Sequence, residues 1–248
     1  MTEETNSFKR ARRRRLIAAW SFCSLAGATL PAAADGWHLD LEALTDVPLD
    51  LGARVSAETP FRLRLSTSVG WLADLYVDGI NAVLVGARAY DQRSAALVAR
   101  ALNSPLVWRT HAGYRPFAGH GFYVDAGYGL VALGGAATTS TAVANAARLT
   151  APVALVGYGR RVELSSLLHL FDLEVGWRWL ILGRIVVRAG IGGAFTFAAW
   201  SSLVPKPTPT PSRLVTKFES DAASYLSDLY RHYFFTPTVT LAAGYQFF

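Results

Sequence analysis

The sequence predicts an all-β fold, an eight-stranded antiparallel up-and-down barrel that crosses a membrane. Segments of about ten residues alternate between apolar and small or polar side chains, as in a strand whose two faces meet different media. Short and long connections follow each other in turn along the chain. Aromatic side chains collect near both ends of the segments, as at the two interfaces of a bilayer. Together these observations favour a transmembrane barrel over a soluble β-domain.

Residues 1–34 are predicted to be a cleaved signal peptide, and residues 35–248 the barrel domain. Lys9, Arg10 and Arg12 to Arg15 form a basic start, an apolar stretch spans 16–30, and Ala32-Ala33-Ala34 offers the cleavage site. The apolar stretch is short for a membrane-spanning helix. The mature chain would begin at Asp35.

Composition after removal of the signal excludes two classes of function. The whole chain has 24 Lys and Arg against 18 Asp and Glu, and the signal contains six and two of these, which leaves 18 and 16. A net charge of about +2 gives no basis for binding nucleic acid. Cys23, the only cysteine, lies in the signal, so the mature chain has neither disulfides nor thiolate metal sites.

The first four predicted strands are 37–43, 49–58, 61–71 and 106–114. In the clearest, Phe61, Leu63, Leu65, Thr67, Val69 and Trp71 alternate with Arg62, Arg64, Ser66, Ser68 and Gly70. In the others, the outward positions are Leu39 and Leu41; Leu51, Ala53 and Val55; and Trp108, Thr110 and Ala112.

The last four predicted strands are 122–130, 171–179, 185–194 and 238–248. Their outward positions are Val124, Ala126 and Tyr128; Leu173, Val175 and Trp177; Val187, Ala189 and Ile191; and Val239, Leu241, Ala243, Tyr245 and Phe247. A single helix over 179–200 is the alternative for one apolar stretch, but Arg184, Arg188 and several glycines inside it favour a strand.

The connections support an up-and-down order. Residues 59–60, 117–121 and 180–184 are short connections, whereas 73–105, 134–161 and 199–232 are long. Such barrels have short periplasmic turns and long extracellular loops. Apolar residues recur at helical spacing in two of the long loops: Ile80, Val83, Leu84 and Ala87; Leu97, Val98, Ala101 and Leu102; and Leu214, Phe218, Ala222, Tyr225 and Leu229. We expect short helices there, which either cap the barrel mouth or dock lipopolysaccharide or another envelope protein.

An aromatic girdle is predicted on the outer wall. Trp177 and Trp179 fall at the periplasmic ends of the strands, and Trp71, Trp108 and Trp200 toward the outer ends.

The inward positions carry the main constellation of candidate functional residues. They comprise the cations Arg54, Arg62, Arg64, Arg109, Arg115, Arg178 and Arg188 and the anions Asp40, Glu42, Asp50, Glu58, Asp125, Asp172 and Glu174. Such balance inside a narrow tube predicts an ion-pair network that fills the lumen. A gated narrow channel for solutes or ions is the alternative hypothesis.

Catalysis is the weakest of the hypotheses. Small barrels that deacylate lipid A use a His-x-Ser pair, and no His-x-Ser occurs here. His169 with Ser165 and Glu163 is the nearest approach to a triad. No phosphate loop, dinucleotide motif or metal-ligand spacing appears, so neither a cofactor nor an enzymatic activity is predicted.

The signal, the eight alternating segments and the aromatic carboxyl terminus together resemble the small outer-membrane barrels typified by OmpA and OmpX. The resemblance implies integration in the outer membrane among lipids and lipopolysaccharide, with a structural or interaction role. It also implies that Tyr245, Phe247 and Phe248 are the insertion signal read by the barrel-assembly machinery. The outward face contains Phe247 rather than the terminal Phe248, a departure that leaves the register of the last strand open by one residue.

Overall fold

The computed structural model describes residues 36–86, 105–117, 120–152, 155, 161–206, 212–233 and 235–248. The predicted signal peptide, Ala87, the apolar stripe at 97–102 and residues 207–211 of the proline-rich run lie outside the described residues. What the sequence predicts for them stays a prediction.

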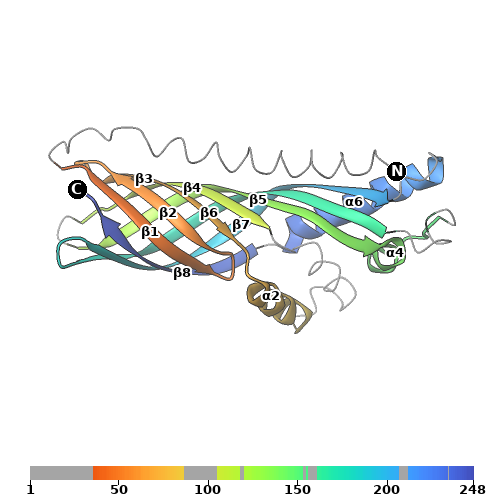
Figure 1. Cartoon of the computed structure of the whole chain (residues 1–248), viewed down its shortest axis with the longest axis horizontal. Coiled ribbons are helices and arrows are strands. Elements are labelled where there is room, and N and C mark those ends of the chain that lie inside the picture. Colours follow the sequence, from red (N-terminus) through yellow and green to blue (C-terminus); the bar gives the residue numbers. More distant parts are fainter. Residues whose placement is uncertain are drawn as a thin grey trace, which may run out of the picture. The chain divides into compact units, whose positions relative to one another are not determined.

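Eight strands form a closed barrel in which each strand pairs with its chain neighbours and the last pairs with the first (Figure 1). All eight pairings are antiparallel, as predicted. The strands are β1 (His38–Val47), β2 (Asp50–Glu58), β3 (Leu63–Trp71), β4 (Leu106–Tyr114), β5 (Phe122–Thr139), β6 (Arg161–Ile181), β7 (Ile185–Lys206) and β8 (Phe235–Gln246).

Within the described parts of the long connections lie the helices α2 (Asp74–Gly86) after β3, α4 (Ser140–Ala147) after β5, and α6 (Arg213–Tyr233) before β8. Among the helices that the structure describes, none combines the length and the apolar character needed to cross a membrane. We call the end of the barrel with these helices the loop end, and the end with the short β2–β3, β4–β5 and β6–β7 connections the turn end.

Three strands extend about ten residues further at the loop end than the sequence predicted. β5 continues to Thr139 instead of ending at Leu130, β6 begins at Arg161 instead of Phe171, and β7 continues to Lys206 instead of ending at Ala194. Beyond the barrel wall they remain paired with each other, from Leu133↔Ser166 and Leu167↔Trp200 to Thr139↔Arg161 and Arg161↔Lys206. We call this three-stranded part the extension; Figure 1 shows it running past the other strands toward α4 and α6.

The two faces of β6 exchange polarity where the barrel gives way to the extension. In the barrel, Asp172 and Glu174 are buried inside while Phe171 and Leu173 are exposed on the outer wall. In the extension, Leu164 is buried on the inner face and Ser165 is exposed on the outer one. The alternation therefore continues through the extension, but with the apolar side chains on the inner face instead of the outer one. For this reason the strand was predicted to begin only at Phe171.

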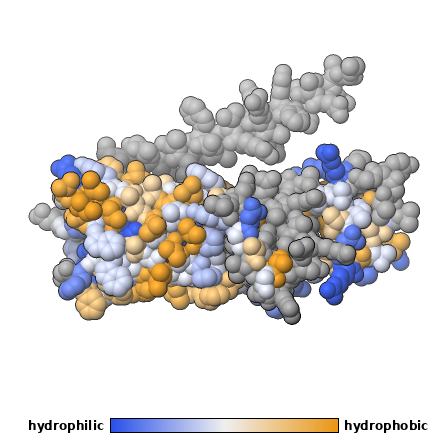
Figure 2. All heavy atoms as spheres, turned by 90° about the horizontal axis from the view of Figure 1, so that it is seen from below, coloured by the Kyte–Doolittle hydropathy of each residue, from blue (hydrophilic) through white to orange (hydrophobic). Residues whose placement is uncertain are grey.

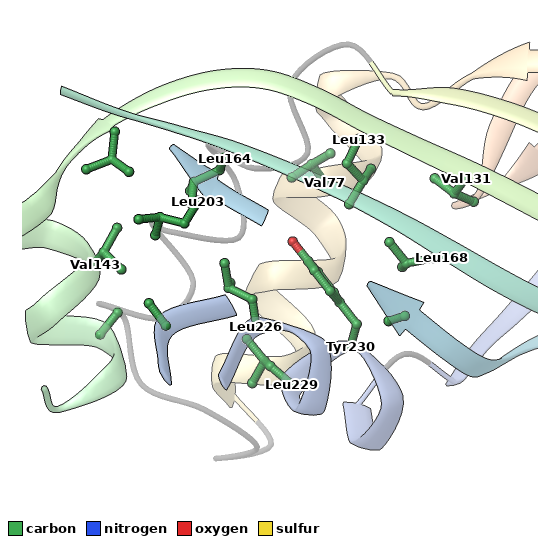
Figure 3. Close-up of a cluster of buried hydrophobic side chains, with 14 of the residues drawn as sticks. Val77, Val131, Leu133, Val143, Leu164, Leu168, Leu203, Leu226, Leu229 and Tyr230 are labelled. Carbon is green, nitrogen blue, oxygen red and sulfur yellow. The ribbon is translucent and has the colours of Figure 1, made fainter. Parts of the chain in front are cut away.

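An apolar core fills the space between the inner face of the extension and the helices (Figure 3). Leu226 and Tyr230 of α6 are fully buried, and Ser227 of the same helix accepts a hydrogen bond at 3.1 Å from the backbone N–H of Ser201 on β7. The buried residues of this apolar core include Val77, Leu133, Val143, Leu155, Val162, Leu164, Leu168, Leu203, Val215, Phe218, Ala222, Leu226, Leu229 and Tyr230. We call the extension with α4 and α6 the cap.

The outer wall of the barrel is largely apolar, and the face seen in Figure 2 shows hydrophobic (orange) patches among paler residues. Large hydrophobic side chains are exposed around it, among them Leu41, Val55, Leu65, Val69, Leu173, Ile191, Val239 and Leu241. A closed sheet pairs its backbone groups internally, so it can present such a wall to lipid.

Candidate functional site

The inward faces of the barrel strands place charged side chains in a buried lumen. Five of the predicted arginines and seven of the predicted carboxylates lie there, and each of these residues is at most 6% exposed: Arg54, Arg64, Arg109, Arg178, Arg188, Asp40, Glu42, Asp50, Glu58, Asp125, Asp172 and Glu174. We call this set, with Asp46 and Tyr123 described below, the lumen network.

At the turn end, the network connects β6 to the strands that close the barrel. Arg178 of β6 lies 3.0 Å from Asp40 of β1 and donates a hydrogen bond of 2.6 Å to Gln246 of β8. Gln246 in turn lies 3.0 Å from His38. Arg115, just beyond β4, pairs with Glu58 at 2.8 Å. The contacts of Arg178 thus link β6 to both the first and the last strand inside the barrel.

Midway along the lumen, the buried ring of Tyr123 lies between two guanidinium groups. The Cζ atoms of Arg64 and Arg188 are 4.7 and 4.9 Å from the ring centroid, within the range of cation–π attraction. The hydroxyl of Tyr123 donates to Glu174. Both of these arginines also form an ion pair with a carboxylate: Arg64 with Asp125, and Arg188 with Glu42 at 2.8 Å. A third arginine, Arg54, lies 3.5 Å from Glu174.

Toward the loop end, one arginine is surrounded by three aspartates. Arg109 pairs with Asp46, with Asp50 at 3.3 Å and with Asp172 at 3.7 Å. His111 Nε2 lies 3.4 Å from Asp172. The shared partners bring four strands together around a single guanidinium.

Two members of the network were missed from the sequence. Asp46 lies in β1, which continues to Val47 instead of ending at Ala43, so it was assigned to a loop. Tyr123 is followed two residues later by the inward Asp125, and this period of two was the signal that could have found it.

The assignment of Arg62 to the lumen is wrong. β3 begins at Leu63, and Arg62 lies in the preceding turn with a positive φ of 66°. Its guanidinium donates a hydrogen bond of 3.2 Å to the carbonyl of Pro116. The turn that reverses the chain therefore takes Arg62 out of the strand's alternation.

Glycines make room for the large side chains of the network. A Cβ on Gly176 would lie 2.6 Å from the Tyr123 hydroxyl, and one on Gly127 would lie 2.3 Å from the His111 ring. Both distances are shorter than any real contact of this kind, so these wall positions accept no larger residue without displacement of a neighbour.

Between Arg109 and the loop end, the side chains inside the barrel are apolar, a feature that was not predicted from the sequence. Val107, Val131, Leu168 and Leu170 are buried and belong to the core that the cap helices complete. The interior of an eight-stranded barrel is just wide enough for side chains to fill. Ion pairs and then apolar side chains thus occupy it from the turn end to the loop end.

The predicted tryptophans lie on the outer wall near its two ends. Trp177 and Trp179 are near the turn end, where Phe122 contacts Trp177 at a ring distance of 5.1 Å. Trp71, Trp108 and Trp200 lie toward the loop end, with Trp200 60% exposed. Their role as a membrane girdle stays a prediction.

His169 does not form a triad with Ser165 and Glu163. Its Nδ1 lies 2.5 Å from the Tyr128 hydroxyl, and its ring meets Trp200 edge-on at 4.5 Å. Ser165 instead lies 2.7 Å from Ser202, and Glu163 pairs with Lys206. Within the described part of the chain, no cluster of His, Cys, Asp or Glu could hold a metal ion.

The predicted insertion signal lies at the closing seam. Tyr245 and Phe247 are exposed on the outer wall, with their rings 5.4 Å apart. Beyond the end of β8, Phe247 donates to the Leu39 carbonyl at 2.9 Å, and Leu39 donates to the Phe248 carbonyl at 3.2 Å. Both terminal residues therefore continue the pairing with β1, and Phe247 is the one on the outward face.

No protein-family model and no curated protein matches the sequence. Among solved structures, the chain is similar to the N-terminal β-barrel domain of Pseudomonas aeruginosa OprF (TM-score 0.42, 8% identity, 85% of this chain and 96% of that one). It is also similar to a major outer membrane protein from Thermus thermophilus (TM-score 0.43, 13% identity, 85% and 98%) and to Acinetobacter baumannii CarO (TM-score 0.36, 12% identity, 84% and 97%). At these values the likeness concerns the fold alone. The closed eight-stranded sheet, with its apolar outer wall and charged lumen, is itself the architecture of a small outer-membrane-type β-barrel.

Proposed function

We propose that this chain is an outer-membrane barrel with a sealed lumen and a structural or interaction role, in which the cap is presented outside the cell. The observation that carries the proposal is the filled interior. Paired charges occupy the lumen around Arg178, Tyr123 and Arg109, and the apolar core under α6 follows them. No catalytic step is assigned to the chain.

The distribution of polarity supports a membrane location. An apolar outer wall around a buried charged lumen suits lipid outside the barrel, whereas the reversed faces of the extension suit water outside the cap. Outer-membrane lipids, including lipopolysaccharide, would then surround the wall between the two groups of tryptophans. The long connections of such barrels face the cell exterior, which would place the cap there.

Conductance in a planar bilayer tests the sealed lumen. The refolded chain should insert and show no steady current, because an ion would have to separate buried pairs such as Arg188–Glu42 and then cross the apolar core. Stable ohmic channels would overturn the sealed model.

A narrow channel is the second candidate, and one observation favours it. The buried hydroxyls of Ser56, Ser66 and Ser68 make no hydrogen bond among the described residues. Ser56 is directly opposite Ser66 in the β2–β3 register. Such a row could line a thin polar path. If currents are seen, Ser66→Leu should reduce them while Leu65→Ala on the outer wall should not.

The carboxyl terminus is proposed to act as the signal for insertion by the barrel-assembly machinery. Deletion of Phe247 and Phe248 removes two backbone hydrogen bonds to β1 and an outward aromatic ring at the seam. We expect export to continue but the fraction of folded barrel in outer-membrane preparations to fall severalfold, because an open edge in lipid leaves polar groups unpaired. Deletion of Phe248 alone should do less. Normal insertion of the double deletion would contradict this role.

A further inference from the structure

The outer face of β5, β6 and β7 has an aromatic band where the barrel meets the extension. Tyr128, His169, Phe197 and Trp200 contact one another at ring distances between 4.5 and 6.4 Å. Nδ1 of His169 faces the Tyr128 hydroxyl, and the His169 ring lies edge-on to Trp200. Aromatic groups with polar edges favour the boundary between hydrocarbon and headgroups. The band therefore marks the level at which lipid headgroups would lie.

Beyond this band, the same face carries hydroxyl groups, the exposed Val204 and then charges. Ser165 and Ser202 are exposed and 2.7 Å apart across the β6–β7 register. Glu163 and Lys206 form an ion pair. Arg161 is exposed and lies directly opposite Lys206 in the register. We call Arg161, Glu163, Ser165, Ser202 and Lys206 the headgroup surface.

The Arg161–Lys206 arrangement is electrostatically unfavourable by itself. Like charges directly opposite on neighbouring strands destabilise a sheet. Glu163 compensates Lys206, but Arg161 has no ion-pair partner among the described residues. An anion placed between the guanidinium and the ammonium would relieve this repulsion.

We infer that the headgroup surface binds the phosphorylated sugar headgroup of an outer-leaflet glycolipid, an inference that rests on the proposed function. Arg161 and Lys206 would hold a phosphate, because a guanidinium and an ammonium are its natural donors. Ser165 and Ser202 would meet sugar hydroxyls, and the exposed rings of Phe197 and Trp200 would pack on the acyl chains below. Apart from Val204, the order along the strands is rings, then hydroxyls, then cations, which is the order of a phosphoglycolipid from its chains outward.

Binding of lipid A by the full chain in phosphatidylcholine nanodiscs tests the inference. The double variant Arg161→Ser/Lys206→Ser should lose roughly fivefold in affinity per cation removed. The matched control is Arg213→Ser/Lys217→Ser, which removes two exposed cations from α6 and should change affinity less than twofold. The mobility shift on heating, measured for every variant, reports whether the barrel is folded.

The inference is overturned if the folded Arg161→Ser/Lys206→Ser variant retains parental affinity, or if lipid A stripped of phosphate binds as tightly as the intact lipid. Preferential binding of an acidic peptide to the same residues would also overturn it. Inorganic phosphate should compete only weakly, because it lacks the sugar and the chains; full competition at equal concentration would contradict the glycolipid.

A separate measurement distinguishes failure of the proposed function. The only cysteine of the sequence is Cys23, in the predicted signal peptide, so Cys23→Ser/Ser220→Cys places a single thiol in the chain, in α6. Labelling of intact cells by a membrane-impermeant maleimide would support the outward cap. Absence of labelling, with labelling recovered in lysed cells, would overturn the orientation and the glycolipid inference with it. Labelling together with unchanged lipid binding would overturn the glycolipid inference alone.

Discussion

The lumen network and the apolar core of the cap are built by the same strands but depend on different forces. β6 contributes Glu174 to the first and Leu164 to the second. In the barrel, the outer wall is apolar, so the polar side chains of the strand turn inward and pair with each other. In the cap, the outer face of the extension carries polar side chains such as Ser165 and Ser202, and apolar side chains of the strands turn inward and pack under α6. The comparison teaches that the interior is charged where the outer wall exposes large apolar side chains, and apolar where the strands run on under the cap helices.

The two regions should therefore respond differently to substitution. In the lumen network, removal of one partner leaves a buried charge without compensation, which costs more than the pair contributes. In the cap, removal of a side chain costs the lost burial and the cavity, and neighbours partly collapse into the space. The predictions below test this difference, from the largest expected effect to the smallest.

The largest effect is expected from Arg64→Leu. The substitution leaves Asp125 buried without its cation and removes one of the two guanidiniums on Tyr123, so the free energy of unfolding should fall by about 3–5 kcal/mol. Arg64→Leu/Asp125→Leu should recover most of the loss. Urea unfolding in lipid vesicles, followed by tryptophan fluorescence, measures both. A double variant as unstable as the sum of the single ones would show that the pair is not the stabilising unit.

In the cap, Leu226→Ala should cost about 2–5 kcal/mol of local stability, because Leu226 is fully buried between α6 and the extension. Hydrogen exchange of the α6 amides should accelerate while the urea midpoint of the barrel stays unchanged. Leu214→Ala, at a side chain that is 70% exposed on the same helix, is the control and should alter neither. Loss of barrel stability together with the cap would show that the two regions unfold as one unit.

The barrel itself could be predicted from sequence because its outer wall repeats one signal. Leu63, Leu65 and Val69, for example, alternate with small or charged residues and are exposed on the wall. The same alternation predicted inward positions for Arg54, Arg64, Arg109, Arg178 and Arg188, which are buried, and also for Arg62, which lies in a turn. That residue was misplaced because a positive φ in the turn, invisible in a pattern of polarity, ends the alternation one residue before Leu63.

The extension could not be predicted by the same reasoning. Along β6, the apolar wall positions Phe171 and Leu173 are odd-numbered, whereas the buried positions Val162, Leu164 and Leu168 are even-numbered. If β6 is assumed to face lipid on one side along its whole length, this switch of the apolar positions from odd to even numbers looks like the end of the strand. The strand in fact continues, and its buried apolar side chains pack against α6, which is distant in the chain.

The smallest change in the free energy of unfolding is expected from Gly→Ala substitutions, which compare the packing of the two regions without altering a charge. A Cβ on Gly176, in the lumen wall, would lie 2.5 Å from the Ala189 carbonyl and 2.6 Å from the Tyr123 hydroxyl, so Gly176→Ala should lower the free energy of unfolding by about 1–3 kcal/mol. Gly134, exposed at the start of the extension, has nothing within 4 Å of its Cβ position, so Gly134→Ala should change stability by less than about 0.5 kcal/mol. Urea midpoints of the two variants, measured in the same vesicles, give the comparison. Equal midpoints would mean that the Tyr123 ring moves freely in the lumen, and that this part of the interior is more loosely packed than its paired charges indicate.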